Sequence, residues 1–532
     1  MRAEFAIVDL FAGPGGLAEG FWSFETAAEG RPFTVKMSVE KEKSAHQTLS
    51  FRAFLRQFGP RFPQEYYDWL NHGGSEPDWQ SLYPSEWQAA RDEALCLTLG
   101  EEATSSIVAK RIAEIRKNHR DRTILIGGPP CQAYSLVGRA RNRGNADYDA
   151  ALDQRHFLYR EYISIISQLE PAAFVMENVK GMLSSTVDGV RMFDLITADL
   201  KAPPGTQGYE LYALAGKGGQ CISKGVRPAD FVVRAEDFGI PQARHRVIII
   251  GLRRDVADAL ERAGPLPQRR PYPEATLSHV LDGMPRLRSG LSKRPDSAAA
   301  WQAALEQSCV DLMELSLDLP EEMAEAFRTT VHSVSQAIRE SAPLPRSANK
   351  PNGIGNACHS ALAGWLKDDR LYMLPNNETR SHMSTDLTRY LYAAAWAACT
   401  GQSPKASAFP ASLAPSHRSW SSGKFADRFR VQLREQPSTT ITSHISKDGH
   451  YFIHPDPSQC RSLTVREAAR LQTFPDNYLF RGNRTEQYVQ VGNAVPPFLA
   501  LQIAEALWDV LSRIDEAECD PDEERAQIAE VA

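Results

Sequence analysis

The feature that most constrains the fold is an alternation of short apolar runs with helix-like stretches over the first 250 residues. Such alternation is typical of a parallel β-sheet covered by helices, so we predict an α/β fold. Ligands of open α/β sheets bind outside the carboxyl ends of the strands, and the chemistry should be sought there. The strand candidates are Phe5–Phe11, Thr34–Glu40, Ile124–Gly127, Ala173–Glu177 and Val247–Leu252.

Length and composition narrow the class of protein. A chain of 532 residues with 42% hydrophobic content predicts roughly two or three globular domains and excludes collagen-like, coiled-coil and wholly disordered chains. No run of about 18 apolar residues occurs, which predicts that no segment spans a membrane, and the N-terminal residues do not resemble a signal peptide. The eight cysteines are scattered without a CxxC pair, which argues against zinc fingers, Fe–S sites and a disulfide framework and favours a reducing cytoplasm.

Changes of composition divide the rest of the chain. Residues 51–99 are aromatic and polar, and we interpret them as a helical insertion of unknown role. After the Pro-rich segment GPLPQRRPYPEA, Ser297–Ala342 looks helical, whereas Asn349–Gln436 has the weak periodicity of loops and short elements. Thr464, followed three residues later by Glu467, forms the capping-box pattern that begins a helix.

A glycine-rich turn follows the first apolar run. In Asp9–Leu17, glycines at positions 13, 15 and 16 permit a tight strand-to-helix turn and let a ligand approach bare backbone. Glu40 ends the next strand, 27 residues after Gly13, where a carboxylate can bind ribose hydroxyls. An ordinary loop would explain the glycines alone, but together with Glu40 they favour a nucleoside-containing cofactor. The G-x-G-G spacing differs from G-x-G-x-x-G, which disfavours a nicotinamide enzyme.

Two further strand ends carry reactive side chains. In GGPPCQAYS, two glycines and two prolines make a rigid turn that presents Cys131 outward, so this thiol is a candidate nucleophile rather than an inert core cysteine. Glu177 ends the apolar run FVME, where desolvation favours a proton-donating role. Taken alone, a Glu-Asn pair at a strand end is more often structural, so both roles stay open for Glu177 at this point.

Two more patterns lie farther along the chain. Arg244 and Arg246 in QARHR stand two positions apart at the start of a strand, so they can point to the same face and converge on one anionic or carbonyl-bearing target. Near the C-terminus, QVGNAVPP contains Asn493, a residue type that tolerates left-handed backbone, and two prolines that stiffen a turn.

Together these motifs resemble the motif series of the DNA (cytosine-5) methyltransferases of prokaryotic type. The segments are DLFAGPGG, GGPPCQAYS, MENVKGM, QARHR, LTVREAARLQTFPDNY and QVGNAVPP, in this order. The resemblance covers residues 5–251 and 437–501, and the segment between them matches nothing specific. It implies a Rossmann-like methyltransferase domain, with a mostly parallel sheet flanked by helices, and a smaller, irregular target-recognition domain.

The resemblance implies a covalent mechanism. The Cys131 thiolate attacks C6 of cytosine while Glu177 donates a hydrogen bond or proton to N3, and the activated C5 takes a methyl group from S-adenosylmethionine (SAM). Arg246, with Arg244, matches the family arginines that hold the cytosine O2 and the catalytic loop. Because the target atom is inaccessible in a stacked duplex, the base must be flipped out of the helix.

The resemblance also implies a cofactor site that binds SAM and contains no metal. One departure is that the insertion separates Glu40 from the third strand, so we assign the family's adenine-contacting acidic residue to Glu101 or Glu102. The positions that match the family's cofactor site are Phe11, Gly13, Gly15, Gly16, Glu40, Pro129, Asn493 and Val495.

The resemblance also divides the chain into domains. The catalytic domain takes residues 1–260 and 481–514, the target-recognition domain takes 261–480, and residues 515–532 form an acidic tail. Residues 341–436 contain 12 Lys+Arg and 6 Asp+Glu, a local charge of +6 that suits contact with phosphates. The expected DNA-binding residues are Ser135, Arg155, Arg418, Lys424, Arg428 and Arg430.

The formal charge of −6 does not argue against a DNA partner, because the acidic tail alone holds eight acidic side chains and one basic. The sequence therefore predicts a cytoplasmic, nucleoid-associated DNA (cytosine-5-)-methyltransferase that acts on double-stranded DNA as a monomer. It would be solitary or paired with a restriction or phage-defence system. Two alternatives stay open: a tRNA cytosine-5 methyltransferase of the same family, and a catalytically inactive DNA-binding regulator.

Overall fold

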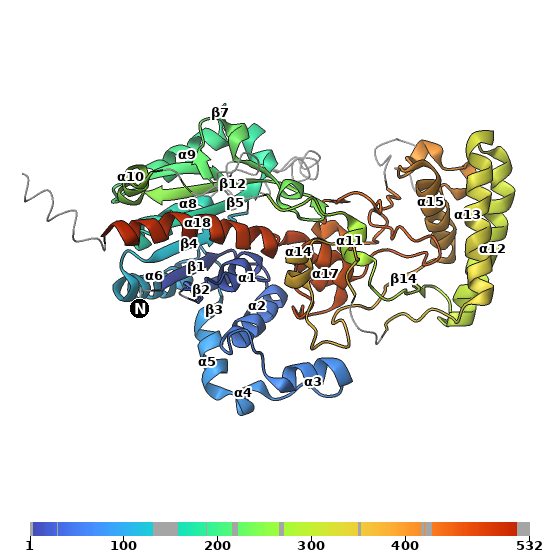
Figure 1. The fold of residues 1–532 in the computed structure, drawn as a ribbon, viewed down its shortest axis with the longest axis horizontal. Helices are drawn as coiled ribbons and strands as arrows, with labels where there is room; N and C mark the ends of the chain where they lie inside the picture. Colours follow the sequence, from blue (N-terminus) through green and yellow to red (C-terminus); the bar gives the residue numbers. More distant parts are fainter. Residues whose placement is uncertain are drawn as a thin grey trace, which may run out of the picture.

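The molecule is elongated, with a helix-covered β-sheet at one end and a group of long helices at the other (Figure 1). Segments from both halves of the chain meet between these two ends. The computed structural model describes residues 4–28, 30–130, 158–187, 189–214, 222–264, 266, 271–348, 353–415, 420 and 428–518.

A nine-stranded mixed sheet forms the first end of the molecule. Its strands are β1 Phe5–Leu10, β2 Phe33–Glu40, β3 Ala94–Cys96, β4 Thr123–Gly127, β5 Ala173–Val179, β8 Tyr209–Leu214, β9 Ile222–Lys224, β10 Val232–Arg234 and β12 His245–Arg253. The order is β3-β2-β1-β4-β5-β12-β8-β9, with β10 paired to β12. The first five strands in this order are parallel, whereas β12 is antiparallel to both β5 and β8. All five predicted strands are present, and the predicted α/β class is confirmed.

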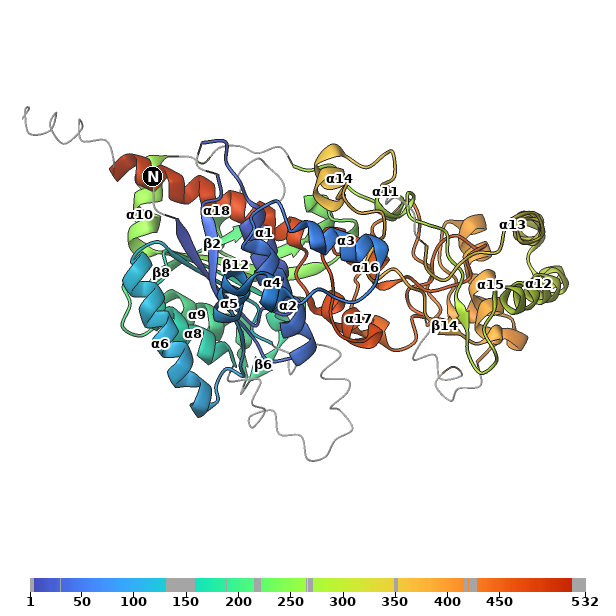
Figure 2. The same cartoon turned by 90° about the horizontal axis from the view of Figure 1, so that it is seen from below.

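Helices cover both faces of this sheet (Figure 2). One face carries α1 Gly16–Ser23, α10 Arg254–Ala263 and α18 Pro497–Glu518, and the other carries α6 Glu102–His119, α8 Leu158–Leu169 and α9 Met192–Lys201. Alternate residues of β1 belong to opposite cores, with Ile7 under the first set of helices and Val8 under the second. Because both faces are covered, every side chain of β1 is buried and the strand reads as a continuous run rather than an alternating one.

One helical stretch among the described residues, 484–512, is long and apolar enough to cross a membrane. However, 78% of its most apolar window is buried inside the molecule. Most of that stretch belongs to α18, which packs against α1 and α10. These are the properties of a core helix.

The predicted insertion is helical and builds its own aromatic core. Its helices are α2 Lys43–Arg56, α3 Gln64–His72, α4 Trp79–Leu82 and α5 Pro84–Glu93. The rings of Phe51, Phe54, Tyr66 and Trp79 pack at centroid distances between 5.5 and 6.0 Å. β3 follows directly, so the insertion returns the chain to the edge of the sheet.

A separate hydrophobic core lies at the far end of the molecule. Its main helices are α12 Ala298–Leu315, α13 Glu321–Glu340 and α15 Ser384–Thr400. The helical prediction for Ser297–Ala342 is confirmed, but the prediction of loops and short elements over Asn349–Gln436 is wrong at α15, which has 17 residues. α15 is buried over most of its length, so its apolar residues do not form the one-sided stripe of a surface helix.

Short elements connect the two ends of the molecule. They are the helices α11 Leu277–Leu281, α14 Ser360–Leu366, α16 Val465–Leu471 and α17 Arg484–Asn493, and the small strand pairs β11 Gln242–Ala243 with β15 Ser438–Thr439 and β13 Gly290–Leu291 with β14 Ser381–His382. A further small pair, β6 Thr186–Val187 with β7 Val190–Arg191, lies beside α9 at the sheet end (Figure 1). Side chains of α11, α14, α16 and α17 belong to the sheet-side core. The separate core runs from Leu291 to Cys460, a narrower range than the predicted domain 261–480. The capping box is confirmed, since Thr464 Oγ1 accepts from the Glu467 N–H and Glu467 accepts from the Thr464 N–H.

Candidate active site

The loop after β1 is a backbone cradle. Phe11, Gly13 and Gly15 have positive φ angles of 56°, 58° and 97°, which only glycine adopts readily, so Phe11 is held in a strained conformation. Glu40, at the end of β2, accepts hydrogen bonds from the N–H groups of Gly13 (2.8 Å) and Glu42 (2.7 Å). A Cβ atom on Gly13 would meet no atom within 4 Å, so this backbone faces open space where a ligand can lie.

The last sequence motif packs directly against this cradle. A Cβ atom on Gly16 would lie 2.3 Å from the main-chain oxygen of Val495, so the two segments touch through bare backbone. Val495 is half-buried, whereas Asn493 is exposed at the end of α17 and is helical rather than left-handed. The fold therefore brings predicted positions from the two ends of the chain together.

Glu177 and Arg246 form an ion pair at the end of β5, with Arg246 Nε 2.9 Å from Glu177 Oε1. Arg246 lies opposite Val179 in the antiparallel pair of β12 and β5, so Glu177 is its diagonal neighbour, a separation that long side chains bridge. The side chain of Arg246 is 17% exposed and that of Glu177 is 14% exposed. A Cβ atom on Gly128 would lie 3.0 Å from Glu177 Oε2, so the GGPP turn lies against this carboxylate.

Asn178 joins the same turn to β5. Its buried Nδ2 donates to the carbonyl of Pro129 (3.1 Å), and its Oδ1 accepts from the N–H of Val179 (2.8 Å). Pro129 is thereby fixed beside Glu177. Asn178 was not among the predicted site residues, although an amide at the end of an apolar strand was a usable signal.

Arg244 does not share the target of Arg246. It is 2% exposed, and its guanidinium donates to the carbonyls of Ile441 (2.9 Å), Gly492 (3.3 Å) and Ala494 (2.9 Å). The prediction that the two arginines converge on one target is wrong. Arg244 precedes β12, so strand alternation does not set its direction, and it ties the last motif to the β11–β12 segment.

Two buried glutamines extend this network, and neither was predicted. Gln472 Nε2 donates to the carbonyls of Val491 (2.7 Å) and Ala494 (3.1 Å). Gln242 Nε2 donates to Gln472 Oε1 (2.7 Å), and Gln242 Oε1 accepts from the N–H of Ile441 (2.8 Å). The motifs QARHR, LQTFPD and QVGNAVPP therefore form one hydrogen-bonded unit beneath the cradle.

Two buried ion pairs hold the segment between Arg461 and Asp476. Arg461 donates two bonds to Glu467 (2.7 and 2.6 Å), and Arg470 donates two to Asp476 (2.8 and 2.7 Å). Burial alone would raise the pKa of Glu467, but the charge and hydrogen bonds of Arg461 outweigh it and lower the pKa to about 2. Glu467 therefore carries a charge at any ordinary pH.

Several predicted residues lie outside the described part of the chain. These are Cys131, Ser135, Arg155, Arg418 and Lys424. Pro130 is the last described residue before Cys131.

The two remaining predicted DNA contacts lie in the region that leads to β15. Arg428 pairs with Asp448 at 3.4 Å, and the Arg430 guanidinium lies over the Tyr451 ring, 4.9 Å from its centroid. Glu101 and Glu102 are exposed at the start of α6 and are the first carboxylates after β3. Their assignments stay predictions.

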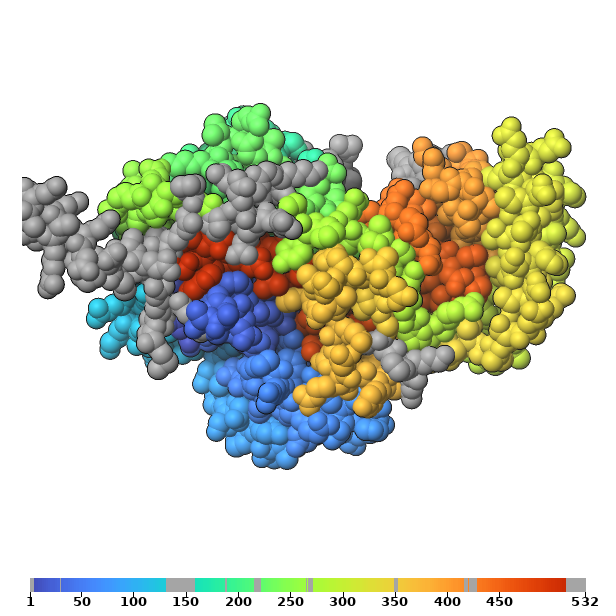
Figure 3. Space-filling view, in the orientation of Figure 1, coloured from blue at the N-terminus to red at the C-terminus, as the bar shows by residue number. Residues whose placement is uncertain are grey.

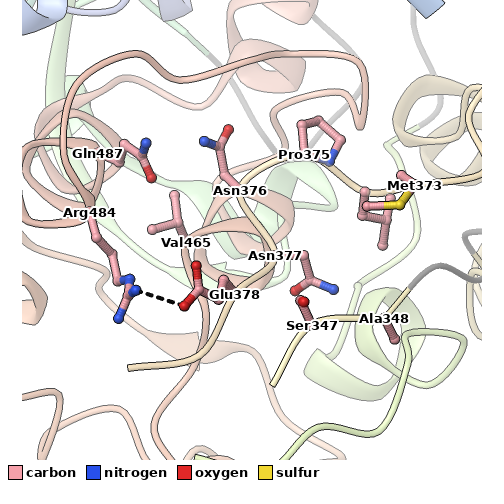
Figure 4. A pocket seen from close by; sticks show the side chains of 11 residues that line it. Ser347, Ala348, Met373, Pro375, Asn376, Asn377, Glu378, Val465, Arg484 and Gln487 are labelled. Atoms are coloured by element: carbon pink, nitrogen blue, oxygen red, sulfur yellow. Dashed lines mark hydrogen bonds and ion pairs between the residues drawn. The ribbon is translucent and has the colours of Figure 1, made fainter. Parts of the chain in front are cut away.

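A hollow of about 380 Å³, lined by both polar and apolar side chains, opens at the other end of α17. Figure 4 shows Arg484, in the first turn of α17, joined to Glu378 by an ion pair of 3.1 Å. Arg346 also lies 3.1 Å from Glu378. Because Asn493 ends the same helix, this hollow is separate from the cradle at the strand ends.

Comparisons with known proteins agree with the motif series. A family model described as C-5 cytosine-specific DNA methylase matches residues 79–509. Type II methyltransferase M.Bpa9945I of Bacillus paralicheniformis is 31% identical over 522 residues, which cover 95% of this chain and 99% of that protein. Type II methyltransferase M.AgeI of Thalassovita gelatinovora is 29% identical, covering 83% of this chain and 97% of that one. Among solved structures, the Entamoeba histolytica methyltransferase EhMeth covers 96% of this chain and 99% of its own, at 12% identity and a TM-score of 0.42.

Proposed function

The chain belongs to the C-5 cytosine-specific DNA methylase family and is a DNA (cytosine-5-)-methyltransferase, and we propose that it methylates C5 of a cytosine flipped out of a specific duplex sequence, with SAM as the donor. The observation that carries the proposal is the Glu177–Arg246 pair against the GGPP turn. An acid and a cation meet there at the strand ends, beside the turn that leads to Cys131.

The residues of the cradle fit SAM. Its ribose hydroxyls need a carboxylate, and Glu40 lies within hydrogen-bond distance of the Gly13 backbone at the edge of the open space. The backbone N–H groups of a glycine-rich turn at a helix start can approach the amino-acid part of the ligand closely. When bound, SAM supplies the methyl group.

The protein's own groups then act on the cytosine. The Cys131 thiolate forms a bond to C6, and the electron pair of the C5–C6 bond becomes available at C5. Glu177 donates a hydrogen bond or proton to N3, and Arg246 binds O2 while it also holds Glu177 in place. C5 takes the methyl group. Loss of the C5 proton to water, departure of the Cys131 sulfur as a thiolate and return of any N3 proton to Glu177 then restore the aromatic ring.

A second part of the proposal concerns how the enzyme recognises DNA and where it acts. We propose that residues 261–480 recognise the DNA sequence and that the basic stretch 341–436 contacts phosphates. Its relatives are named type II methyltransferases, and we propose that the enzyme is paired with a restriction or defence system or is solitary. We also propose that it acts in the cytoplasm as a monomer.

A duplex that carries 5-fluorocytosine tests the mechanism. C5 then has no proton to lose, so the enzyme and SAM should form a covalent adduct with the DNA that survives denaturing electrophoresis. Cys131→Ala should give no adduct and no methylation while it still binds SAM. Cys399→Ser is the matched control, because Cys399 lies beside the Thr330 hydroxyl in the far helical core and should not affect either result.

Each alternative has its own outcome. Label from tritiated SAM in tRNA but not in duplex DNA would establish the RNA-modifying branch. DNA binding with no methyl transfer to either nucleic acid would identify an inactive regulator. Turnover by Cys131→Ala near the wild-type rate would refute the covalent mechanism.

A further inference from the structure

The helical insertion reaches the cofactor cradle through the short segment Asn477–Tyr478, and it contacts the recognition side at residues 368–372. We propose that Tyr478 is a positioning residue for the SAM-binding turn and that the insertion helix α3 holds it in place through Asn477. This inference rests on the proposed function, since it concerns the affinity of the same turn for SAM. It assigns a role to the insertion.

Tyr478 bonds directly to the cradle. Its hydroxyl donates to the carbonyl of Pro14, within the glycine-rich turn. A Cβ atom on Gly15 would lie 3.0 Å from this hydroxyl and 2.9 Å from Leu49 Cδ1, so the underside of the turn rests on Tyr478 and α2. Glu40 accepts a hydrogen bond from the Gly13 N–H, and Tyr478 donates one to the Pro14 carbonyl. The turn is therefore held at two adjacent residues by side chains from two different segments of the chain.

Tyr478 is itself immobilised by its surroundings. The side chain is fully buried, and the Arg52 guanidinium lies over its ring, 4.7 Å from the centroid. Arg52 comes from α2 and also pairs with Glu19 of α1, at 2.9 Å from Nε to Oε2. The hydroxyl therefore has little freedom to leave Pro14, and a phenylalanine would keep the packing but lose the bond.

The neighbouring Asn477 connects this residue to the insertion. Its carbonyl accepts from the Tyr66 hydroxyl of α3 (2.7 Å), and its Oδ1 accepts from Arg52 Nη1 (3.1 Å). Its Nδ2 donates to Asp368 Oδ2 (2.7 Å). Every polar group of this side chain is thus bonded, which fixes the backbone that carries Tyr478.

Helix α3 also contacts residues 368–372 on the recognition side. The Tyr67 hydroxyl donates to Asp368 Oδ2 (2.7 Å), and the Arg370 guanidinium lies over the Tyr67 ring, 3.7 Å from its centroid. Asn71 Oδ1 accepts from the N–H of Tyr372 (2.7 Å). α3 therefore links the segment 368–372 to the cradle through adjacent tyrosines, Tyr66 and Tyr67.

Ordinary core packing is the competing explanation, and it makes a different prediction. If Tyr478 only fills space, its replacement by phenylalanine changes the amount of folded enzyme and leaves the KM for SAM unchanged. If it positions the turn, the KM for SAM rises while kcat per folded molecule stays the same. The second result follows because the Pro14 carbonyl loses its donor and the turn becomes freer before SAM binds.

The test compares the full-length wild type with Tyr478→Phe, Tyr66→Phe and the control Tyr83→Phe. Binding of S-adenosylhomocysteine is measured by calorimetry, and KM and kcat by transfer of tritiated methyl groups. Tyr478→Phe should weaken binding and raise the KM for SAM about five- to tenfold, with kcat within about twofold. Tyr66→Phe should weaken binding about two- to threefold, because it loosens Asn477 without touching the turn. Tyr83→Phe loses only an exposed bond to Glu65 and should match the wild type.

The outcomes separate this inference from the proposed function. A wild type that does not bind S-adenosylhomocysteine would overturn the proposed function. A wild type that binds, together with Tyr478→Phe and Tyr66→Phe of unchanged affinity, would overturn the positioning role alone. If Tyr478→Phe does not fold, the affinity of Tyr66→Phe decides the question.

Discussion

A methyl group added at Gly128 should slow catalysis without unfolding the protein. An ideal Cβ atom on Gly128 lies 3.0 Å from Glu177 Oε2 and 3.5 Å from the Glu177 carbonyl oxygen. The first contact is too close for a Cβ atom, so the end of the Glu177 side chain must move by a few tenths of an ångström. Arg246, at 2.9 Å from the same carboxylate, must move with it or lose the pair.

The expected magnitude follows from this displacement. A misplacement of about 1 Å in an active site costs about a hundredfold in rate, so a few tenths of an ångström should reduce kcat about five- to tenfold, or about 1 kcal/mol. The atom that moves is the far end of a flexible side chain, so the free energy of unfolding should change by less than about 1 kcal/mol. The KM for SAM should stay within about twofold, because the three atoms nearest to a Cβ on Gly128 all belong to Glu177.

The assay is transfer of tritiated methyl groups to unmethylated duplex DNA, with urea unfolding measured on the same preparations. Gly364→Ala is the matched control: it adds the same methyl group within α14, where the Cβ would meet no atom within 4 Å. It should keep the wild-type kcat and gain up to about 1 kcal/mol of stability. A Gly128→Ala enzyme with the wild-type kcat, or with a loss that matches its loss of folded protein, would refute the reasoning.

Three further changes test other parts of the structure. Burial, reinforced by the charge of Arg461, lowers the pKa of His454 from 6.5 to about 4, so its contribution to stability is complete above pH 6.5 and is lost as the pH falls toward 4. Burial also lowers the pKa values of His382 and His450, which add to the loss of stability in acid. Between about pH 7.5 and pH 5, His454→Gln should therefore lose about 2 kcal/mol less in urea unfolding than the wild type. An equal loss in that variant would contradict the assignment. Thr464→Ala removes the cap of α16 and should cost about 1–2 kcal/mol in urea unfolding, whereas Thr329→Ala, on the exposed surface of α13, should cost less than about 0.5 kcal/mol. Gly16→Ala should abolish binding of S-adenosylhomocysteine, because its Cβ would lie 2.3 Å from a main-chain oxygen that cannot move aside; unchanged binding would show that the turn and the last motif are not in fixed contact.

The parts of the fold that could be predicted are those that local sequence determines. β2, β4 and β5 are largely apolar runs that end on or next to a glycine or a charged residue, and the cap at Thr464 is a four-residue pattern. α15 could not be predicted in this way, because burial on most sides removes the periodicity that marks a helix.

The parts of the site that could not be predicted depend on tertiary pairing. The Glu177–Arg246 pair exists because β12 enters the sheet antiparallel beside β5, and nothing near Arg246 in sequence fixes that register. For Arg244, a local pattern was present but misleading. Its spacing from Arg246 suggested a shared target, whereas its hydrogen bonds go to carbonyls that lie 197 to 250 positions away in the sequence. Hydrogen-bonding partners so far apart in sequence leave no local pattern.

Charge is distributed so unevenly that the total says nothing about docking. Residues 298–340 hold eight acidic and two basic side chains, whereas 341–436 hold 6 acidic and 12 basic. The acidic helices α12 and α13 lie at the end of the molecule farthest from the sheet (Figure 3). α15 lies within residues 341–436 and packs against both α12 and α13, so the acidic and basic regions adjoin each other. On the proposed function, we expect phosphates to be attracted to the basic segment and repelled from the acidic helices α12 and α13.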